Sequence, residues 1–214
     1  MLESLGFPNL RALSLRHLHM DDLRVLGLFP GLESLEVWQS EKVRSLAGLE
    51  RVRVLRSLSL SELGALPSLE PIAAQPHLEE LLLAGGIWKD QILACGFGPL
   101  AELRQLRKLG VYNVRGVTDF GPLLGFTRLA RLDVATAFFP VEEVARLAKR
   151  YPFWAKPRPW LVSHDSIEAK CGRCGGGQVL LLLQRKKRLW CPSCDAVRLQ
   201  KTLQAFEALI GEPG

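Results

Sequence analysis

A single pattern, Leu-x-x-Leu-x-(Leu/Val), occurs six times in the first two thirds of the 214-residue chain and restricts its fold more than any other feature. Successive copies begin 22, 23, 23, 28 and 23 residues apart. A unit this short cannot bury its own leucines, so we expect the copies to stack and form one continuous core. The pattern residues are Leu10-Leu13-Leu15, Leu32-Leu35-Val37, Leu55-Leu58-Leu60, Leu78-Leu81-Leu83, Leu106-Leu109-Val111 and Leu129-Leu132-Val134.

This pattern and its period are similar to those of leucine-rich-repeat proteins. The resemblance implies an α/β solenoid with parallel strands on a concave face and short helical or irregular returns. A bundle of amphipathic helices is the alternative, because Leu-x-x-Leu also fits a period of 3.6 residues. However, the Pro and Gly residues before each new copy would break such helices every two turns.

The chain differs from many such repeats at the position eight residues after the first Leu. That position often holds Asn or Cys, whose side chain bonds to the backbone of the turn. Here the turns must be satisfied in another way. The residues at this position are Leu18, Ser40, Leu63, Gly86, Val114 and Ala137.

The outward face of the predicted strands is the candidate binding surface. Side chains alternate along a strand, so the third, fifth and seventh positions of each copy should point away from the core. These positions carry no continuous basic stripe, so we do not expect the face to follow a phosphate backbone. Trp38 and Tyr112 either bind a partner, as aromatic hot-spot residues do, or cover neighbouring strands. The predicted partner-binding residues are Glu36, Trp38, Glu80, Leu82, Lys108, Tyr112 and Arg131.

The fourth copy is five residues longer than its neighbours, with the extra residues between Gly85 and Pro99. Insertions in repeats often form binding loops. Our preferred interpretation is instead a helix from Trp88 to Ala94 on the convex side. Cys95 is expected to be a small buried apolar residue rather than a nucleophile.

The two ends of the repeat array differ. Residues 2–10 are similar to the second half of a copy whose strand is missing, which would leave the first strand uncovered. Either the N-terminus is truncated or a neighbouring molecule covers this edge. At the other end, residues 140–151 predict a capping helix, with Pro140 at its start and Lys149 and Arg150 in its last turn.

Four of the five cysteines form the pairs Cys171-Gly-Arg-Cys174 and Cys191-Pro-Ser-Cys194, which are separated by sixteen residues. This spacing is typical of a zinc site, because each short turn directs two sulfurs at one ion. Four thiolates leave no coordination position for water, so we expect one structural Zn²⁺ ion rather than a catalytic one. Iron or redox use is the alternative.

The residues between the cysteine pairs predict a strand over 178–184, a turn over 185–187 and a returning strand over 188–190. The whole segment resembles a zinc ribbon. Its basic tip is either a contact for nucleic-acid phosphates or a solvated hairpin end that discourages aggregation. The candidate phosphate-binding residues are Arg185, Lys186, Lys187 and Arg188.

The formal net charge of +6 comes mainly from the last part of the chain, where residues 151–214 hold 10 basic and 5 acidic residues. Four thiolates with one Zn²⁺ would lower the charge of this part from +5 to about +3. That is a modest bias for a nucleic-acid-binding protein. After the ribbon, apolar residues at helical spacing predict a final helix that stops at Gly211.

Together these features predict a leucine-rich-repeat solenoid over residues 1–151, a docked connector rich in Pro and Trp over residues 152–166, and a Cys₄ zinc ribbon with a C-terminal helix over residues 167–214. The sequence contains no GxSxG, P-loop, HExxH or GxGxxG motif, and its four histidines are scattered. We therefore expect a non-enzymatic protein that binds a protein partner. The alternatives are a nucleic-acid-associated factor and a subunit of a larger assembly joined through the N-terminal edge.

The location is predicted from the start of the chain and from its cysteines. An acid stands where an export signal would carry basic residues, and the longest apolar run, from Val179 to Leu183, is too short to cross a bilayer. Paired Cys-x-x-Cys motifs indicate a reducing compartment. We expect a cytoplasmic protein without membrane contact, and the composition, rich in Leu, Arg, Ala and Pro, suggests a bacterial source.

Overall fold

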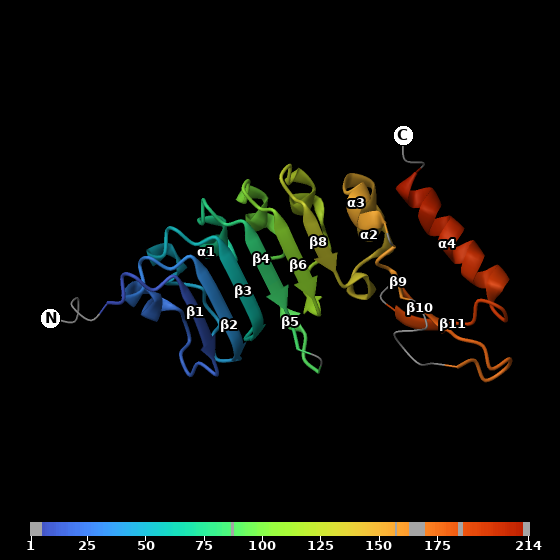
Figure 1. Ribbon diagram of the computed structural model, residues 1–214, viewed down its shortest axis with the longest axis horizontal. Coiled ribbons are helices and arrows are strands. Elements are labelled where there is room, and N and C mark those ends of the chain that lie inside the picture. Colours follow the sequence, from blue (N-terminus) through green and yellow to red (C-terminus); the bar gives the residue numbers. More distant parts are fainter. Residues whose placement is uncertain (1–5, 87, 157, 163–169, 184–185, 212–214) are drawn as a thin grey trace. The chain divides into compact units, whose positions relative to one another are not determined.

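The computed structural model describes residues 6–86, 88–156, 158–162, 170–183 and 186–211, with the backbone alone for residues 186–188. The chain divides into two compact units, residues 1–133 and residues 134–214 (Figure 1). The three-part division expected from the sequence, with boundaries after residues 151 and 166, remains a prediction.

A parallel six-stranded sheet forms the centre of the first unit, in the order β1-β2-β3-β4-β6-β8 (Figure 1). Every strand begins two residues after the first Leu of a copy. Residues at the same repeat position are partners across the sheet, as Leu58 is with Leu35 and with Leu81. The predicted parallel arrangement is thus confirmed. The strands are β1 (Ala12–Arg16), β2 (Ser34–Ser40), β3 (Ser57–Leu63), β4 (Glu80–Ala84), β6 (Lys108–Tyr112) and β8 (Arg131–Val134).

The core of this unit is a stack of pattern leucines. Leu35, Leu58 and Leu109 are each 1% exposed. In β1 the corresponding Leu13 is half-buried, because β1 is the edge strand of the sheet. Short turns of helix return the chain to the next strand, several with Pro in the first turn. They are η1 (Arg24–Leu28), η2 (Leu49–Arg51), α1 (Glu70–Ala73), η3 (Gly98–Glu102) and η4 (Gly121–Gly125).

The second residue of each copy sets the register by backbone hydrogen bonds. The carbonyl of Arg56 accepts the amides of Glu79 and Glu80 from the next copy, at 2.8 and 2.9 Å. The carbonyls of Arg11, Glu33, Glu79 and Arg107 each accept the equivalent two amides from the copy that follows them. The same two bonds, repeated from copy to copy, keep equivalent leucines level in the stack.

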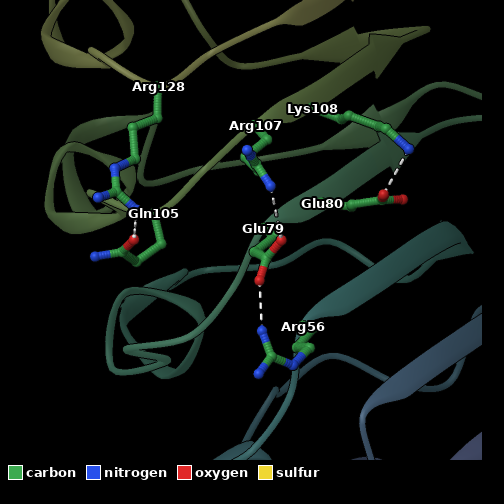
Figure 2. Close-up of polar contacts among 7 residues, drawn as sticks. All are labelled: Arg56, Glu79, Glu80, Gln105, Arg107, Lys108 and Arg128. Atoms are coloured by element: carbon green, nitrogen blue, oxygen red, sulfur yellow. Dashed lines mark hydrogen bonds and ion pairs between the residues drawn. The ribbon is translucent and has the colours of Figure 1, made fainter.

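In the first five copies the side chains at this second position alternate in charge, which was not predicted from the sequence; the sixth copy has Ala130 there. Glu79 lies between Arg56 and Arg107, at 2.5 and 3.8 Å, as Figure 2 shows. Arg11 and Glu33 form the corresponding pair at 3.4 Å between the first two copies. These pairs are exposed, so each contributes about 1 kcal/mol or less to stability. They favour the register without being the source of the fold.

The turns after the strands are satisfied by side chains from several places, in agreement with the missing Asn or Cys ladder. Ser40 Oγ accepts the backbone N–H of Leu18 at 3.0 Å. Gln91, which is 1% exposed, accepts the N–H of Leu63 at 2.9 Å and donates to the carbonyl of Gly64 at 2.8 Å. The insertion in the fourth copy therefore supplies the side chain that the third turn lacks.

The insertion does not form the helix predicted from Trp88 to Ala94. Its residues instead include the two-residue strand β5 (Gln91–Ile92), which pairs in parallel with β7 (Val114–Arg115). An extended backbone lets the insertion continue the stacking of the turns and directs Gln91 inward, so cross-copy hydrogen bonds outweigh the local helical pattern. Cys95, expected to be buried, is half-buried.

The second unit contains a three-stranded antiparallel sheet and helices, with the order β11-β10-β9. The predicted hairpin is confirmed with a shifted boundary, because Lys186 and Lys187 belong to β11 rather than to the turn. The elements are η5 (Thr136–Phe138), α2 (Val141–Arg150), α3 (Pro152–Ala155), β9 (Leu161–Val162), β10 (Val179–Leu183), β11 (Lys186–Trp190) and α4 (Ala196–Ile210).

Two of these helices match the sequence pattern closely. Helix α2 covers all but the end residues of the range predicted for the capping helix, and α4 ends at Ile210, directly before Gly211, whose φ is 76°. The two helices pack on each other. Trp160 lies between Trp154 and Phe206 at ring distances of 6.1 and 4.8 Å, so the connector residues are part of the core of this unit. No helix in the described part of the chain is long and apolar enough to span a membrane.

Candidate metal centre and binding face

The four cysteines of the two Cys-x-x-Cys pairs meet in one cluster. Their sulfur atoms all lie within 4.8 Å of one another. Cys171 Sγ is 3.9 Å from Cys194 Sγ, and Cys174 Sγ is 3.5 Å from Cys191 Sγ. These separations are far longer than the roughly 2.05 Å of a disulfide bond. The cluster therefore has the form of a ligand set with all four thiols free.

The sulfur positions fit a tetrahedral metal ion. A zinc–sulfur bond of about 2.3 Å gives sulfur separations of about 3.8 Å at the corners of a tetrahedron. The observed 3.5 and 3.9 Å bracket this value. Among the described residues, only these four gather as three or more side chains able to hold a metal ion. The four cysteines can thus bind one ion, with no protein ligand missing.

Backbone amides stabilise the thiolate form at the first cysteine of each pair. Hydrogen bonds from the amides of Arg173 and Cys174 lower the pKa of Cys171 to about 6. The amide of Cys194 similarly lowers the pKa of Cys191. By contrast, hydrogen bonding to Cys174 and burial raise the pKa of Cys194 to about 12. Four thiolates this close repel one another, so full deprotonation requires a cation among them.

A hollow of about 400 Å³ lies on the outward face of the strands in the first unit. Leu82, Gly110 and the ring of Tyr112 form its apolar floor. A Cβ on Gly110 would lie 2.7 Å from Leu82 Cδ1 and 3.2 Å from Tyr112 Cε2, so these two side chains lean over the glycine. We call this the strand-face hollow. Its lining residues are Ser57, Leu58, Ser59, Glu80, Leu81, Leu82, Lys108, Leu109, Gly110, Tyr112, Arg131 and Asp133.

Two ion pairs border this hollow. Lys108 Nζ lies 2.5 Å from Glu80 Oε1, as Figure 2 shows, and Arg131 Nε lies 2.7 Å from Asp133 Oδ2. Burial and the nearby Asp133 carboxylate raise the pKa of Tyr112, so its hydroxyl stays protonated at neutral pH. The two basic side chains of the hollow are therefore each matched by an acid.

The structure separates the seven predicted partner-binding residues into two groups. Five of them line the strand-face hollow, while Glu36 and Trp38 do not. Trp38 is half-buried, its Nε1–H donates to Glu62 at 3.0 Å, and the Arg16 guanidinium lies 4.6 Å from its ring centre. Tyr112 is 39% exposed. Tyr112 is thus the more accessible of the two aromatic residues, and a partner-binding role for either residue remains a prediction.

Several residues of the hollow were placed on the outward face by the sequence but not selected as functional. Asp133 was missed because its role depends on Arg131, two residues earlier on the same strand. Gly110 was missed because a glycine has no side chain that could be assigned a binding role from the sequence. The signal that could have found both is the fifth position of the repeat, which they share with Leu82 on the neighbouring part of the sheet.

A second hollow of about 460 Å³ lies in the first unit and includes both histidines after β1. His17 and His19 thus contribute to one surface, although the four histidines are scattered along the sequence. In the insertion, Trp88 is 96% exposed. The hollow is lined by His17, Leu18, His19, Gln39, Glu41, Lys42 and Glu62.

The predicted phosphate-binding tip lies outside the described side chains. Arg185 is not described, and Lys186, Lys187 and Arg188 are described as backbone of β11 alone. Binding of nucleic acid at this tip therefore stays a prediction from the sequence.

Solved structures with a similar fold include internalins and a leucine-rich-repeat protein. Internalin C2 of Listeria monocytogenes aligns with a TM-score of 0.51 and 17% identity, over 69% of this chain and 59% of the internalin. A leucine-rich-repeat protein of Leptospira interrogans gives a TM-score of 0.48 and 18% identity, over 65% of this chain and 35% of that protein. A further internalin of Listeria monocytogenes (inlF) gives a TM-score of 0.46 and 22% identity, over 69% of this chain and 47% of that one.

The chain spans less than two thirds of the length of each of these proteins. No family model matches the sequence, and no curated protein matches it. At 17% identity the likeness to internalin C2 shows the fold alone. The stacked parallel strands and this likeness together establish that the chain has an α/β leucine-rich-repeat fold, followed by a four-cysteine cluster near its C-terminus.

Proposed function

We propose that the protein is a non-enzymatic interaction module that binds a partner protein on the strand-face hollow, with one structural Zn²⁺ ion held by the four cysteines. The observation that carries the binding role is the apolar floor of Leu82, Gly110 and Tyr112 between two ion pairs. An accessible aromatic ring beside apolar surface and charged borders is the arrangement typical of an interface centre.

The charges of the hollow favour a protein over a nucleic acid. Lys108 and Arg131 are neutralised by Glu80 and Asp133, so a phosphate backbone would have to break these pairs. A protein segment that places an uncharged apolar side chain on the floor can leave both pairs in place. The expected occupant is therefore a loop or extended segment of a partner protein with one apolar anchor.

The proposed metal role follows from the ligand set. Four sulfur donors suit Zn²⁺, and they leave no open position at which water could be activated. Cys171 and Cys191 are buried, while Cys174 is exposed, so the ion would join buried and exposed parts of its unit. We therefore propose that the ion stabilises the second unit and takes no part in chemistry.

The binding role can be tested by site-specific cross-linking in cells. A photoreactive amino acid is placed at Ser59, inside the hollow, and in a separate variant at Arg53, an exposed residue on the return segment of the preceding copy. We expect a protein adduct from Ser59 and none from Arg53. The partner identified by mass spectrometry is then purified, and its affinity is measured directly.

For that purified pair, Tyr112→Ala should weaken binding by about 30-fold, the usual cost of removing an aromatic hot spot. Trp38→Ala should have a smaller effect, because Trp38 lies outside the hollow. Equal adducts at both positions, or full affinity of Tyr112→Ala, would refute the proposed site. A steep fall in binding with salt, together with nucleic acid in the adduct, would support the nucleic-acid alternative instead.

A second candidate function, assembly through the N-terminal edge, has its own support. In β1 the pattern residues Leu13 and Leu15 are only half-buried, and Phe7 is 59% exposed. Apolar side chains on an edge strand favour pairing with another strand. Sedimentation velocity over a hundredfold range of concentration tests this, with Leu13→Lys as the variant expected to abolish any association.

A further inference from the structure

The carboxylate of Asp195 connects the two cysteine pairs. Its Oδ1 accepts a hydrogen bond from the Arg173 guanidinium at 2.6 Å, and its Oδ2 accepts the backbone N–H of Cys191 at 3.0 Å. Arg173 lies between Cys171 and Cys174 in the chain. One carboxylate therefore contacts the first cysteine turn through a side chain and the second through the backbone.

Asp195 does not perform the role that its position before a helix predicts. Asp directly before a helix usually accepts an N–H of the first helical turn. Helix α4 has no such side-chain cap, although Asp195 is its preceding residue. The Asp195 side chain is 21% exposed, against 61% for Arg173. The carboxylate is thus turned toward the cysteine turns instead of the helix end.

Each cysteine turn is closed by its own backbone. The amide of Gly175 donates to the carbonyl of Cys171, and the amide of Asp195 donates to the carbonyl of Cys191, both at 2.8 Å. These bonds fix the two sulfurs within a turn. They do not fix the distance from one turn to the other, and the Arg173–Asp195 pair acts on that distance.

The charges agree with such a role. Four thiolates around a divalent cation carry a net charge of about −2, which would repel an isolated carboxylate. Arg173 supplies a neighbouring positive charge, so the carboxylate can approach the cluster and hold the Cys191 amide. The arrangement resembles the outer hydrogen bonds that orient metal ligands in many proteins.

We infer that the Arg173–Asp195 ion pair holds the two cysteine turns at ligand spacing and thereby slows release of the bound ion. Arg173 and Asp195 are positioning residues, since neither is a ligand. The inference rests on the proposed metal site. It names the Arg173–Asp195 pair as one reason why that site would release its ion slowly.

The test measures zinc release from the full-length chain. Protein loaded with one equivalent of Zn²⁺ is mixed with excess pyridylazoresorcinol, and the absorbance of the zinc–dye complex gives the release rate. Arg173→Gln and Asp195→Asn should each speed release by about tenfold. Asp195→Ala should release zinc fastest, because alanine also removes the acceptor of the Cys191 amide, which asparagine keeps.

Three comparisons separate positioning from general stability. Glu207→Gln breaks the Arg158–Glu207 pair, a 2.7 Å contact of α4 in the same unit, and should release zinc at the wild-type rate. Arg173→Lys keeps the charge and should release zinc close to that rate. The double variant Arg173→Gln/Asp195→Asn should be no faster than the faster single variant, since both changes break one interaction.

The outcomes distinguish the inference from the metal site itself. A wild-type chain that retains no stoichiometric zinc would refute the proposed site and the inference with it. A wild-type chain that retains zinc, with Arg173→Gln and Asp195→Asn releasing it as slowly as Glu207→Gln, would overturn the inference alone. Lost helix circular dichroism in Asp195→Asn with an unchanged release rate would likewise overturn it, and would assign Asp195 to helix capping.

Discussion

The core differs between the first unit, residues 1–133, and the ribbon, which is the part of the second unit that holds the four cysteines and the strands β10 and β11. In the first unit, leucines at one repeat position stack from strand to strand, and Leu35, Leu58 and Leu109 are each 1% exposed. In the ribbon, β10 has alternate leucines half-buried, and the four thiols gather within 4.8 Å. A repeat gains core with every added copy. A short hairpin cannot, and here four cysteines gather beside it in a cluster that could hold a metal ion.

Removing the metal should have the largest effect and should act on one unit only. With a chelator present under reducing conditions, we expect residues 170–183 and 186–195 to lose amide protection, because small Cys₄ modules owe most of their folding to the ion. The strands of the first unit should keep their protection. Hydrogen exchange measured by mass spectrometry gives both results at once.

Cys171→Ser should reproduce the effect of the chelator. Cys95 lies outside the cluster, so Cys95→Ser should leave hydrogen exchange in the ribbon unchanged. Protection of β10 and β11 that survives without metal would contradict the comparison, because the ribbon would then have a self-sufficient core.

Within the first unit, the same substitution should cost different amounts in the middle and at the edge of the sheet. Leu58→Ala should lower the free energy of unfolding by about 3 kcal/mol, since it removes packed atoms and leaves a cavity. Leu13→Ala, at the same repeat position in β1, should cost about 1 kcal/mol because Leu13 is already half-exposed. Urea unfolding of the metal-loaded protein measures both.

Equal costs at the two positions would show that the edge is covered in solution, by another copy or by residues outside the described part of the chain. Repeating the measurement at several protein concentrations separates these cases, because only an association between molecules depends on concentration.

The third prediction concerns the two hydrogen bonds that Gln91, from the insertion, makes with the turn after β3. Gln91→Ala leaves the Leu63 amide and the Gly64 carbonyl without their buried partner and should cost about 2 kcal/mol. Gln105→Ala is the matched control, since its bond to Arg128 is exposed and its loss should cost under about 0.5 kcal/mol. Thermal and urea unfolding would show no difference between the two variants if the turn found a substitute, such as an ordered water.

Much of the fold was predictable because it depends on local, repeated information. The period of the leucines defined the strands, their order and their inward residues, since every copy meets a neighbour with the same pattern. The cysteine spacing similarly identified all four members of the cluster, because a metal ion imposes one simple geometry on its ligands. Helix α2 followed from its apolar stripe and its charged ends.

The failures share a different cause, which is competition between local preference and long-range contacts. Trp88 to Ala94 has a pattern compatible with a helix, yet Gln91 and Ile92 pair with Val114 and Arg115, twenty-three residues further along. Residues of neighbouring copies also decide how accessible Trp38 is, since Glu62 accepts its Nε1–H and the Arg16 guanidinium lies 4.6 Å from its ring centre.

The sequence by itself determined the repeat, the parallel order of its strands and the identity of the four clustered cysteines. Only the tertiary structure decided that Leu82, Gly110 and Tyr112 form one floor between two ion pairs, and that Asp195 turns from its helix toward Cys191 and Arg173. The physical reason is the same in both cases. The period of the leucines and the spacing of the cysteines can be read from the order of residues along the chain. A binding surface or a contact between two turns forms only when residues far apart in the sequence come together in the fold.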